Sequence, residues 1–113
     1  MSSKLLKIRI PHGSESAMGP GKADLLEAID RAGSISAAAR EMGMSYKRAW
    51  DLVDTMNRCF KQPLVATATG GSHGGGARVT EFGHDVLRRY RAIECTASAA
   101  VEQEVQVLIS LLS

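Results

Sequence analysis

Three adjacent residues with long hydrogen-bonding side chains, Tyr46, Lys47 and Arg48, stand shortly after the glycine at position 43. Arginine can donate two parallel hydrogen bonds to the O6 and N7 atoms of guanine, and lysine can bind a guanine or a phosphate. Tyrosine can hydrogen-bond a phosphate or press its ring on a thymine methyl group. At the start of a helix, these residue types are typical of a surface that binds nucleic acid.

Solvated side chains are the alternative interpretation of this cluster, because lysine and arginine on an exposed helix face often contact only water. The preceding residues favour nucleic-acid binding. The alanines at 37–39 let two helices approach closely, and Gly43 allows a sharp turn between them. In such a helix-turn-helix, the first residues of the second helix reach the base edges in the major groove of DNA.

The spacing of apolar residues predicts the helices that position this cluster. The first spans about residues 20–32 and ends at Gly33, since glycine accepts the left-handed cap conformation at little cost. A short alanine-rich helix follows and ends at Gly43. The third helix spans about residues 46–60 and has an apolar face formed by Ala49, Leu52, Val53, Met56 and Phe60.

Serine residues stand at the expected starts of the second and third helices. Ser34 or Ser36 is expected to cap the second helix and Ser45 the third, by accepting a hydrogen bond from a free backbone N–H. Backbone amides at these helix ends could also bind phosphate. Trp50 could face DNA from the third helix, but a tryptophan in mid-helix is more often a core or dimer contact, which is our expectation.

Residues 63–69 and 77–80 are short β-prone runs on either side of a glycine-rich segment, and they predict a β-hairpin. The glycines let backbone amides approach a phosphate closely. The Gly-Lys-Ser/Thr of a nucleotide P-loop is missing. A flexible surface loop is the alternative, but a wing against the DNA backbone or minor groove fits better, with Thr69, His73 and Arg78 as contacts.

The two ends of the chain have their own patterns. Residues 4–10 alternate between apolar and basic side chains and predict a half-buried strand, and residues 11–21 predict a loop. After Thr80, a helix cap, the pattern is helical to the end, with an apolar stripe formed by Phe82, Val86, Tyr90, Ile93, Ala97, Val101, Val105, Leu108 and Leu112. A helix of roughly 33 residues is about 50 Å long, which exceeds what the rest of the chain can cover.

Packing of this helix on its own domain is the alternative to a dimer contact, and we expect the dimer. The sequence thus predicts one domain over residues 1–113, with a DNA-binding body and wing at 1–80 and a dimerisation helix at 81–113. The expected class is mainly α with a small β-hairpin, a winged helix-turn-helix with a long C-terminal dimerisation helix. The arginines of the long helix, at positions 88, 89 and 91, could meet phosphates or pair with acidic neighbours.

Composition and charge limit the classes of function. The net charge is +2, but residues 40–91 carry nine basic and five acidic side chains, whereas residues 92–113 carry three glutamates and no basic residue. A basic middle segment favours double-stranded DNA as the partner. No catalytic or metal-ligand spacing is found, so we expect no enzyme activity, no metal and no cofactor. Cys59 and Cys95 are expected to be buried or half-buried thiols. Without a leader or a membrane-spanning run, the chain is expected in the cytoplasm.

The segments GSISAAAREMGMSYKRAWDLVDTMN and LVATATGGSHGGGARVTEFGHDVLRRY resemble the N-terminal DNA-binding domain of the ModE family of molybdate-responsive transcription regulators. The resemblance covers roughly residues 4–94. Its most specific elements are GSIS, SYKRAWD, ATGGSHGGGA followed by threonine, and the FG that opens the last helix. It implies a dimeric winged helix-turn-helix that binds an operator.

By motif, the resemblance implies a recognition surface made of Ser34, Ser36, Ser45, Tyr46, Lys47 and Arg48. It implies a wing made of Thr69, Gly70, Gly71, His73, Gly74, Gly75 and Gly76. Full-length members resembling this chain add a C-terminal pair of small β-barrel modules that bind molybdate. The sequence ends at Ser113 without them, which argues against molybdate as a direct effector. The alternative function is a module that binds a protein or senses an oxyanion, with DNA secondary.

Overall fold

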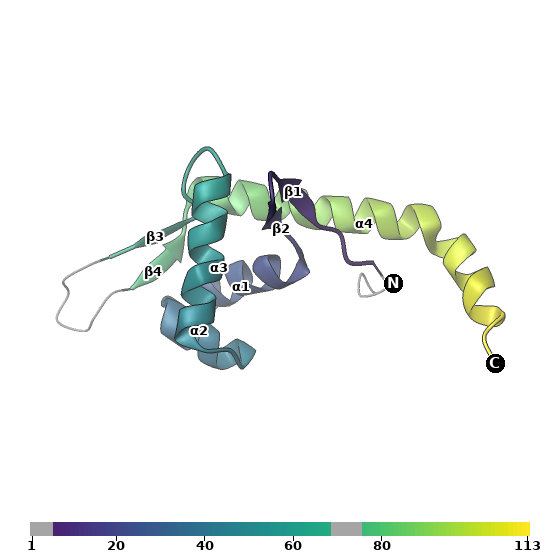
Figure 1. The fold of residues 1–113 in the computed structure, drawn as a ribbon, viewed down its shortest axis with the longest axis horizontal. Coiled ribbons are helices and arrows are strands. Elements are labelled where there is room, and N and C mark those ends of the chain that lie inside the picture. Colours follow the sequence, from purple (N-terminus) through teal and green to yellow (C-terminus); the bar gives the residue numbers. More distant parts are fainter. Residues whose placement is uncertain (1–5, 69–75) are drawn as a thin grey trace.

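The computed structural model describes residues 6–68 and 76–113. Within these ranges a strand pair, three helices, a second strand pair and a long helix follow one another along the chain (Figure 1). The elements are β1 (Ile10–His12), β2 (Glu15–Met18), α1 (Pro20–Ala32), α2 (Ile35–Met42), α3 (Tyr46–Cys59), β3 (Val65–Thr67), β4 (Ala77–Val79) and α4 (Glu81–Ser110). The expected mainly α class with a winged helix-turn-helix is confirmed.

Two glycines end the first two helices, as the sequence predicts. Gly33 has φ 79° and its N–H donates to the Ile29 carbonyl, and Gly43 has φ 69° and donates to the Arg40 carbonyl. A side chain is strained at such positive φ values, so glycine allows each helix to stop and the chain to turn. These two stops fix where α2 begins and where α3 can start.

The core lies between the first three helices and the base of the second hairpin. Its largest fully buried side chains are Met18, Leu25, Leu26, Ile29, Met56 and Leu64. Ala38 and Ala39 on α2 and Ala49 on α3 are also fully or almost fully buried. Their small side chains allow close packing of the helix pair, as expected from the alanine-rich sequence.

The N-terminal prediction is wrong in part. Residues 6–9 are not in a strand, and the first strand pair, β1 with β2, lies where we expected a loop. A strand needs a neighbour for its hydrogen bonds, and β2 reaches back only as far as Ile10, where the register shifts. The preceding segment instead reaches α4, where the Ile8 carbonyl accepts a hydrogen bond from the Tyr90 hydroxyl at 2.6 Å.

The second hairpin is fastened at its base to α3 and α4. Val65 pairs with Val79 in antiparallel register. The Asn57 Oδ1 accepts hydrogen bonds from the backbone N–H groups of Leu64 and Val65, at 2.8 and 3.2 Å. A Cβ atom on Gly83 would collide with the Leu64 carbonyl oxygen, which explains a glycine at the start of α4. The contacts that Asn57 and Gly83 make with this hairpin were not predicted from the sequence.

The long helix has two different halves. Its first half packs on the body and buries Gly83, Tyr90 and Glu94. Its second half extends away from the body (Figure 1), and the exposed apolar residues there are Val107, Leu108, Ile109, Leu111 and Leu112. Cys59 is half-buried as expected, but Cys95 is exposed, because the body no longer covers that side of α4. No helix in the described ranges is long and apolar enough to cross a membrane.

Candidate nucleic-acid interface

The start of α3 places the predicted recognition residues on the surface. The Ser45 hydroxyl accepts a hydrogen bond from the Arg48 N–H at 3.1 Å and caps the helix, as predicted. Tyr46, Lys47 and Arg48 are all exposed. The opposite face of α3 is buried through Ala49, Val53 and Met56, so the helix cannot rotate without losing the core. The first turn of α3 is therefore held with its long side chains in solvent.

The outer face of α3 carries charges of both signs. The Lys47 ammonium lies 3.2 Å from the Asp51 carboxylate, and both side chains are exposed. Farther along, the Arg58 guanidinium binds Asp54 and also Glu15 of the first hairpin, each at 2.9 Å. The hydrogen bond from Arg58 lowers the pKa of the Glu15 carboxyl below its ordinary value. The last turns of α3 are thus tied to the protein, whereas its first turn is open.

Arg48 lies beside two further cations that sequence analysis did not single out. Burial lowers the pKa of the Lys22 ammonium, and the nearby positive charges of Arg48 and Arg9 lower it further. Among the described residues, the Arg48 guanidinium forms no hydrogen bond or ion pair. Arg9, Lys22 and Arg48 thus lie within electrostatic range of one another, together with the Glu15 carboxylate, which acts on Lys22 in the opposite direction. They come from three separate segments, so only folding brings them together.

The start of α2 lies against the base of the second hairpin. The Ser34 hydroxyl accepts a hydrogen bond from the Ala37 N–H at 3.1 Å and is the cap, while Ser36 is exposed with its Oγ 3.5 Å from that of Ser34. The Ala77 N–H donates to the Gly33 carbonyl at 2.9 Å, and Gly76 also adjoins this carbonyl. Figure 1 shows the hairpin leaving the body on the side away from the end of α4.

The structure therefore brings some predicted wing residues to the start of α2. Arg78 is exposed on β4 beside Gly76, opposite Ala66 of β3. The remaining predicted wing residues, Thr69, Gly70, Gly71, His73, Gly74 and Gly75, lie outside the described residues. Their role in DNA binding stays a prediction.

Trp50 is not in the core, which corrects one half of our expectation for it. Its side chain is 45% exposed, and that of Tyr46, one turn earlier, is 55% exposed. The mid-helix position of a tryptophan suggested burial, but the core stripe of α3 passes through Ala49, Val53 and Met56 and leaves Trp50 beside it. The rotation of α3 about its own axis decides which of its side chains are buried. The positions of the apolar residues in the sequence did not define that rotation closely enough to place Trp50.

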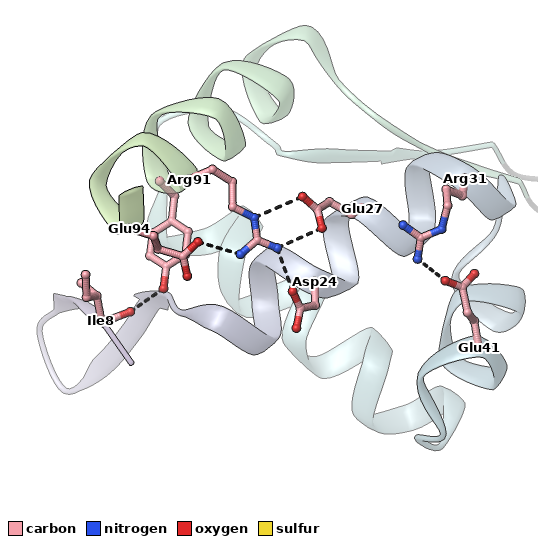
Figure 2. Close-up of polar contacts among 8 residues, drawn as sticks. Ile8, Asp24, Glu27, Arg31, Glu41, Arg91 and Glu94 are labelled. Carbon is pink, nitrogen blue, oxygen red and sulfur yellow. Dashed lines mark hydrogen bonds and ion pairs between the residues drawn. The ribbon is translucent and has the colours of Figure 1, made fainter. Parts of the chain in front are cut away.

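The arginines of α4 bind acidic neighbours in this structure, which is one of the two outcomes that the sequence left open. Arg88 and Arg89 lie 2.7 and 2.9 Å from the two oxygens of Asp85. The hydrogen bond from Arg89, more than that from Arg88, lowers the pKa of the Asp85 carboxyl. Arg91 joins α4 to α1 through several carboxylates (Figure 2). These three guanidinium groups are engaged within the protein.

The Arg91 contacts form the densest polar cluster shown in Figure 2. Its guanidinium binds Asp24 at 2.7 Å, Glu27 at 2.9 Å and Glu94 at 2.8 Å. The hydrogen bonds that the Arg91 guanidinium donates to Glu27 and the other carboxylates raise the pKa of Arg91. A second pair, Arg31 with Glu41, links α1 to α2. In residues 6–68 and 76–113, no group of three His, Cys, Asp or Glu could hold a metal ion.

A comparison with known families agrees with the helix-turn-helix fold described above. Residues 22–84 match the family described as bacterial regulatory helix-turn-helix proteins of the lysR family. This chain belongs to that family. The match spans the three body helices, the second hairpin and the start of α4, which are the elements that position the candidate interface.

The resemblance to ModE proteins is confirmed by curated relatives. The chain is 42% identical over 88 residues to the molybdenum transport protein ModE of Azotobacter vinelandii, covering 78% of this chain and 33% of that protein. It is 49% identical over 84 residues to the molybdenum-pterin-binding protein MopA of Rhodobacter capsulatus, covering 74% and 32%. It is 44% identical over 71 residues to the DNA-binding transcriptional dual regulator ModE of Escherichia coli K12, covering 63% and 27%. The chain thus spans about a third of the length of these relatives.

Two solved structures share the fold at low sequence identity. A MarR family protein from Bacillus stearothermophilus aligns with a TM-score of 0.56 and 20% identity, over 82% of this chain and 69% of that one. ArgP from Mycobacterium tuberculosis aligns with a TM-score of 0.53 and 20% identity, over 75% and 30%. These likenesses support the winged helix-turn-helix architecture.

Proposed function

We propose that the protein is a DNA-binding transcription regulator, without enzyme activity, that reads an operator as a dimer. The first turn of α3 enters the major groove, and the second hairpin lies on the backbone or in the minor groove. The observation that carries this proposal is the rigidly capped, exposed first turn of α3 in a chain of the helix-turn-helix family. Because the relatives are named for molybdenum and for transcription regulation, we extend the proposal to genes of molybdate metabolism.

The proposed interface makes two kinds of contact with DNA, one with a base and the others with phosphates. Arg48, whose guanidinium has no partner in the described part of the chain, donates two hydrogen bonds to a guanine. Lys47 and the neighbouring Lys22 bind phosphates, and so do the exposed Ser36 and the hairpin residue Arg78. Phosphate contacts fix the position of the protein and make its affinity fall steeply with salt, whereas the base contact selects the sequence.

The test is to select a preferred duplex from a random pool and to measure its binding by fluorescence anisotropy at low and moderate salt. Arg48→Ala should lose about 1–3 kcal/mol of the preference for the selected duplex over a random one. Arg88→Ala removes the same charge from α4, where the guanidinium is bound by Asp85, and is the matched control. Equal discrimination by both variants would remove Arg48 from base reading. Absence of duplex binding at either salt would favour the protein-binding alternative.

The dimer part of the proposal rests on the second half of α4. Its apolar residues are exposed on a helix that extends beyond the body, a costly arrangement for a monomer. Two copies of this segment would bury them and hold two recognition helices on one operator, about 34 Å apart in a half-site pair. The assignment of residues 81–113 as the dimerisation segment is therefore part of the proposal, with the helix itself ending at Ser110.

Sedimentation equilibrium tests the dimer directly. Leu108→Glu with Leu112→Glu places one charge in the last turns of α4 and one just after its end, both at exposed apolar positions, and should give monomers. Gln103→Glu with Gln106→Glu adds the same charge at exposed polar positions and should leave the dimer intact. A monomeric wild-type protein, or equal effects of the two pairs, would contradict the assignment.

A further inference from the structure

We propose that Trp50 selects a thymine in the operator, through the 5-methyl group and the O4 atom that this base presents in the major groove. The inference rests on the proposed function and adds a base-selecting residue to it. Sequence analysis placed Trp50 among core or dimer contacts. The exposed position on α3, next to the recognition residues, is the first observation against that assignment.

The exposure of two aromatic rings side by side is unusual for a small body. Tyr46 and Trp50 are separated by four residues, so their side chains are neighbours on the helix surface. The other large apolar side chains that are exposed in the described residues all lie on α4 or just after it: Ile93, Val107, Leu108, Ile109, Leu111 and Leu112. An exposed aromatic pair near the start of α3 is typical of a surface that binds a partner.

The shape beside Trp50 suits the edge of one base. Tyr46, Lys47, Trp50 and Asp51 line a shallow recess of about 320 Å³ at the start of α3. The ion pair between Lys47 and Asp51, at 3.2 Å, forms its polar rim. The two aromatic rings offer an apolar surface, and a cation stands next to it where the phosphates of a groove would lie.

The indole group has the chemistry that distinguishes thymine from cytosine. In the major groove, thymine presents the O4 acceptor and the 5-methyl group, whereas cytosine presents an N4 donor and lacks the methyl. Tryptophan has an apolar ring and one N–H that can only donate. It can therefore contact the methyl and donate to O4 of thymine, while cytosine would oppose donor to donor. Guanine and adenine also present acceptors in the major groove but lack the methyl group, so the methyl contact is what selects thymine among these bases.

Arg48 and Trp50 are two residues apart, on opposite flanks of the exposed face of α3, so they would contact different bases. Four residues of an α-helix advance about 6 Å, and stacked base pairs are about 3.4 Å apart along the DNA axis. Trp50 would therefore reach a base one or two steps from those contacted by the first turn. The thymine is predicted close to the guanine read by Arg48, within the same half-site.

The experiment uses the full chain and the duplex selected for the proposed function. Trp50 is the single tryptophan, so the intrinsic emission reports on this side chain alone. Binding of the duplex should change the emission and protect the indole from acrylamide. Replacing thymines one at a time with deoxyuridine removes only the methyl, and one replacement should weaken wild-type binding about fourfold, the value for losing one buried methyl.

Two substitutions assign the effect to the ring. Trp50→Ala should bind the thymine and deoxyuridine duplexes equally, and Trp50→Phe, which keeps an aromatic ring, should keep the methyl preference. Circular dichroism confirms that each variant is folded. The inference is overturned if every deoxyuridine duplex binds the wild type normally and the emission is unchanged, while Arg48→Ala still loses discrimination.

Two other results would also overturn the inference about Trp50, and the measurements distinguish them from each other. An emission change that follows protein concentration without DNA would mean that a second copy covers Trp50. Failure to bind any duplex would defeat the proposed function first, whatever the state of the indole.

Discussion

Arg91 of α4 and Arg48 of α3 are the same residue type on two helices of one domain, but their surroundings differ. The Arg91 side chain is 29% exposed and binds carboxylates from α1 and from its own helix. The Arg48 guanidinium is exposed, and it has no ion-pair partner within residues 6–68 and 76–113. Its positive charge, with that of Arg9, lowers the pKa of the partly buried Lys22, on which Glu15 acts in the opposite direction.

This difference shows which basic side chains of the chain are available to bind a partner. Cations that meet carboxylates of other elements, such as Arg58 with Glu15 and Arg91 with Asp24, hold elements together and have their charge offset within the protein. Cations that meet other cations, such as Arg48, leave a positive surface that attracts a polyanion. The net charge of a segment cannot separate these two groups, because it counts both equally. The four predictions below test whether the separation is real.

The largest expected effect comes from removing the anchored arginine. Arg91→Ala leaves the carboxylates of Asp24, Glu27 and the 5% exposed Glu94 without their shared cation. Breaking such a partly buried cluster should lower the free energy of unfolding by about 2–3 kcal/mol. Urea unfolding measures this, with Arg88→Ala as a control that should change stability by less than about 0.5 kcal/mol. DNA affinity per folded molecule should not change, and a loss there would place Arg91 on the DNA surface.

The next effect concerns the cap that holds the open end of α3. Ser45→Ala removes the hydroxyl that accepts from the Arg48 N–H, and should lower the free energy of unfolding by about 1 kcal/mol. Ser36→Ala is the matched control, because Ser36 caps no helix in the structure. Thermal melts measure the stability of both variants. If Ser45→Ala matched its control, the first turn of α3 would not depend on the cap.

A smaller effect is expected from the one carboxylate that partly neutralises the open end. Asp51→Asn frees Lys47 and removes a negative charge facing the phosphates, so affinity for random duplex should rise about fivefold at low salt. Preference for the selected duplex should fall because the added binding is not sequence-specific. Asp54→Asn is the control, since Asp54 lies two turns from the start of α3 and binds Arg58. Equal gains from both substitutions would show that only net charge matters.

Much of the fold could be predicted because single residues decide it locally. Gly33, Gly43 and the caps Ser45 and Thr80 each act within a few residues of their own position, so their spacing in the sequence fixes the helix ends. The first strand pair was missed, since pairing depends on which segment lies alongside. Ser34 could be named as one of two possible caps, but not chosen, without the geometry of the turn.

The candidate site could be predicted only in its contiguous part. Tyr46, Lys47 and Arg48 are neighbours in sequence and lie together on the surface, as expected. Lys22 joins them only through the packing of α1 on α3, and the position of Trp50 depends on the phase of one helix. Contacts between distant segments, such as Arg91 with Asp24, leave no short pattern in the sequence. These features were not predicted because they depend on how segments that are far apart in the sequence pack in the folded protein.

The smallest expected effect is a pH dependence at the anchored end of α4. Burial raises the pKa of the Tyr90 phenol above its ordinary value of 10.0, and the negative charge of Glu94 raises it further. The folded state thus holds the neutral phenol, whose hydroxyl donates to the Ile8 carbonyl. This contribution to stability is complete below the ordinary value and is lost as the pH rises through the raised one.

Urea unfolding of wild type and Tyr90→Phe at pH 8 and at several values between about pH 10 and 12 measures this contribution. The wild type should be the more stable protein at pH 8, by about 1 kcal/mol for one buried hydrogen bond. The difference should shrink as the pH rises, because the unfolded wild type gains a phenolate that the folded protein resists. A difference that stays constant would mean that burial does not control this tyrosine. The anchored half of α4 would then be as open to solvent as the start of α3, and the contrast between the two regions would fail.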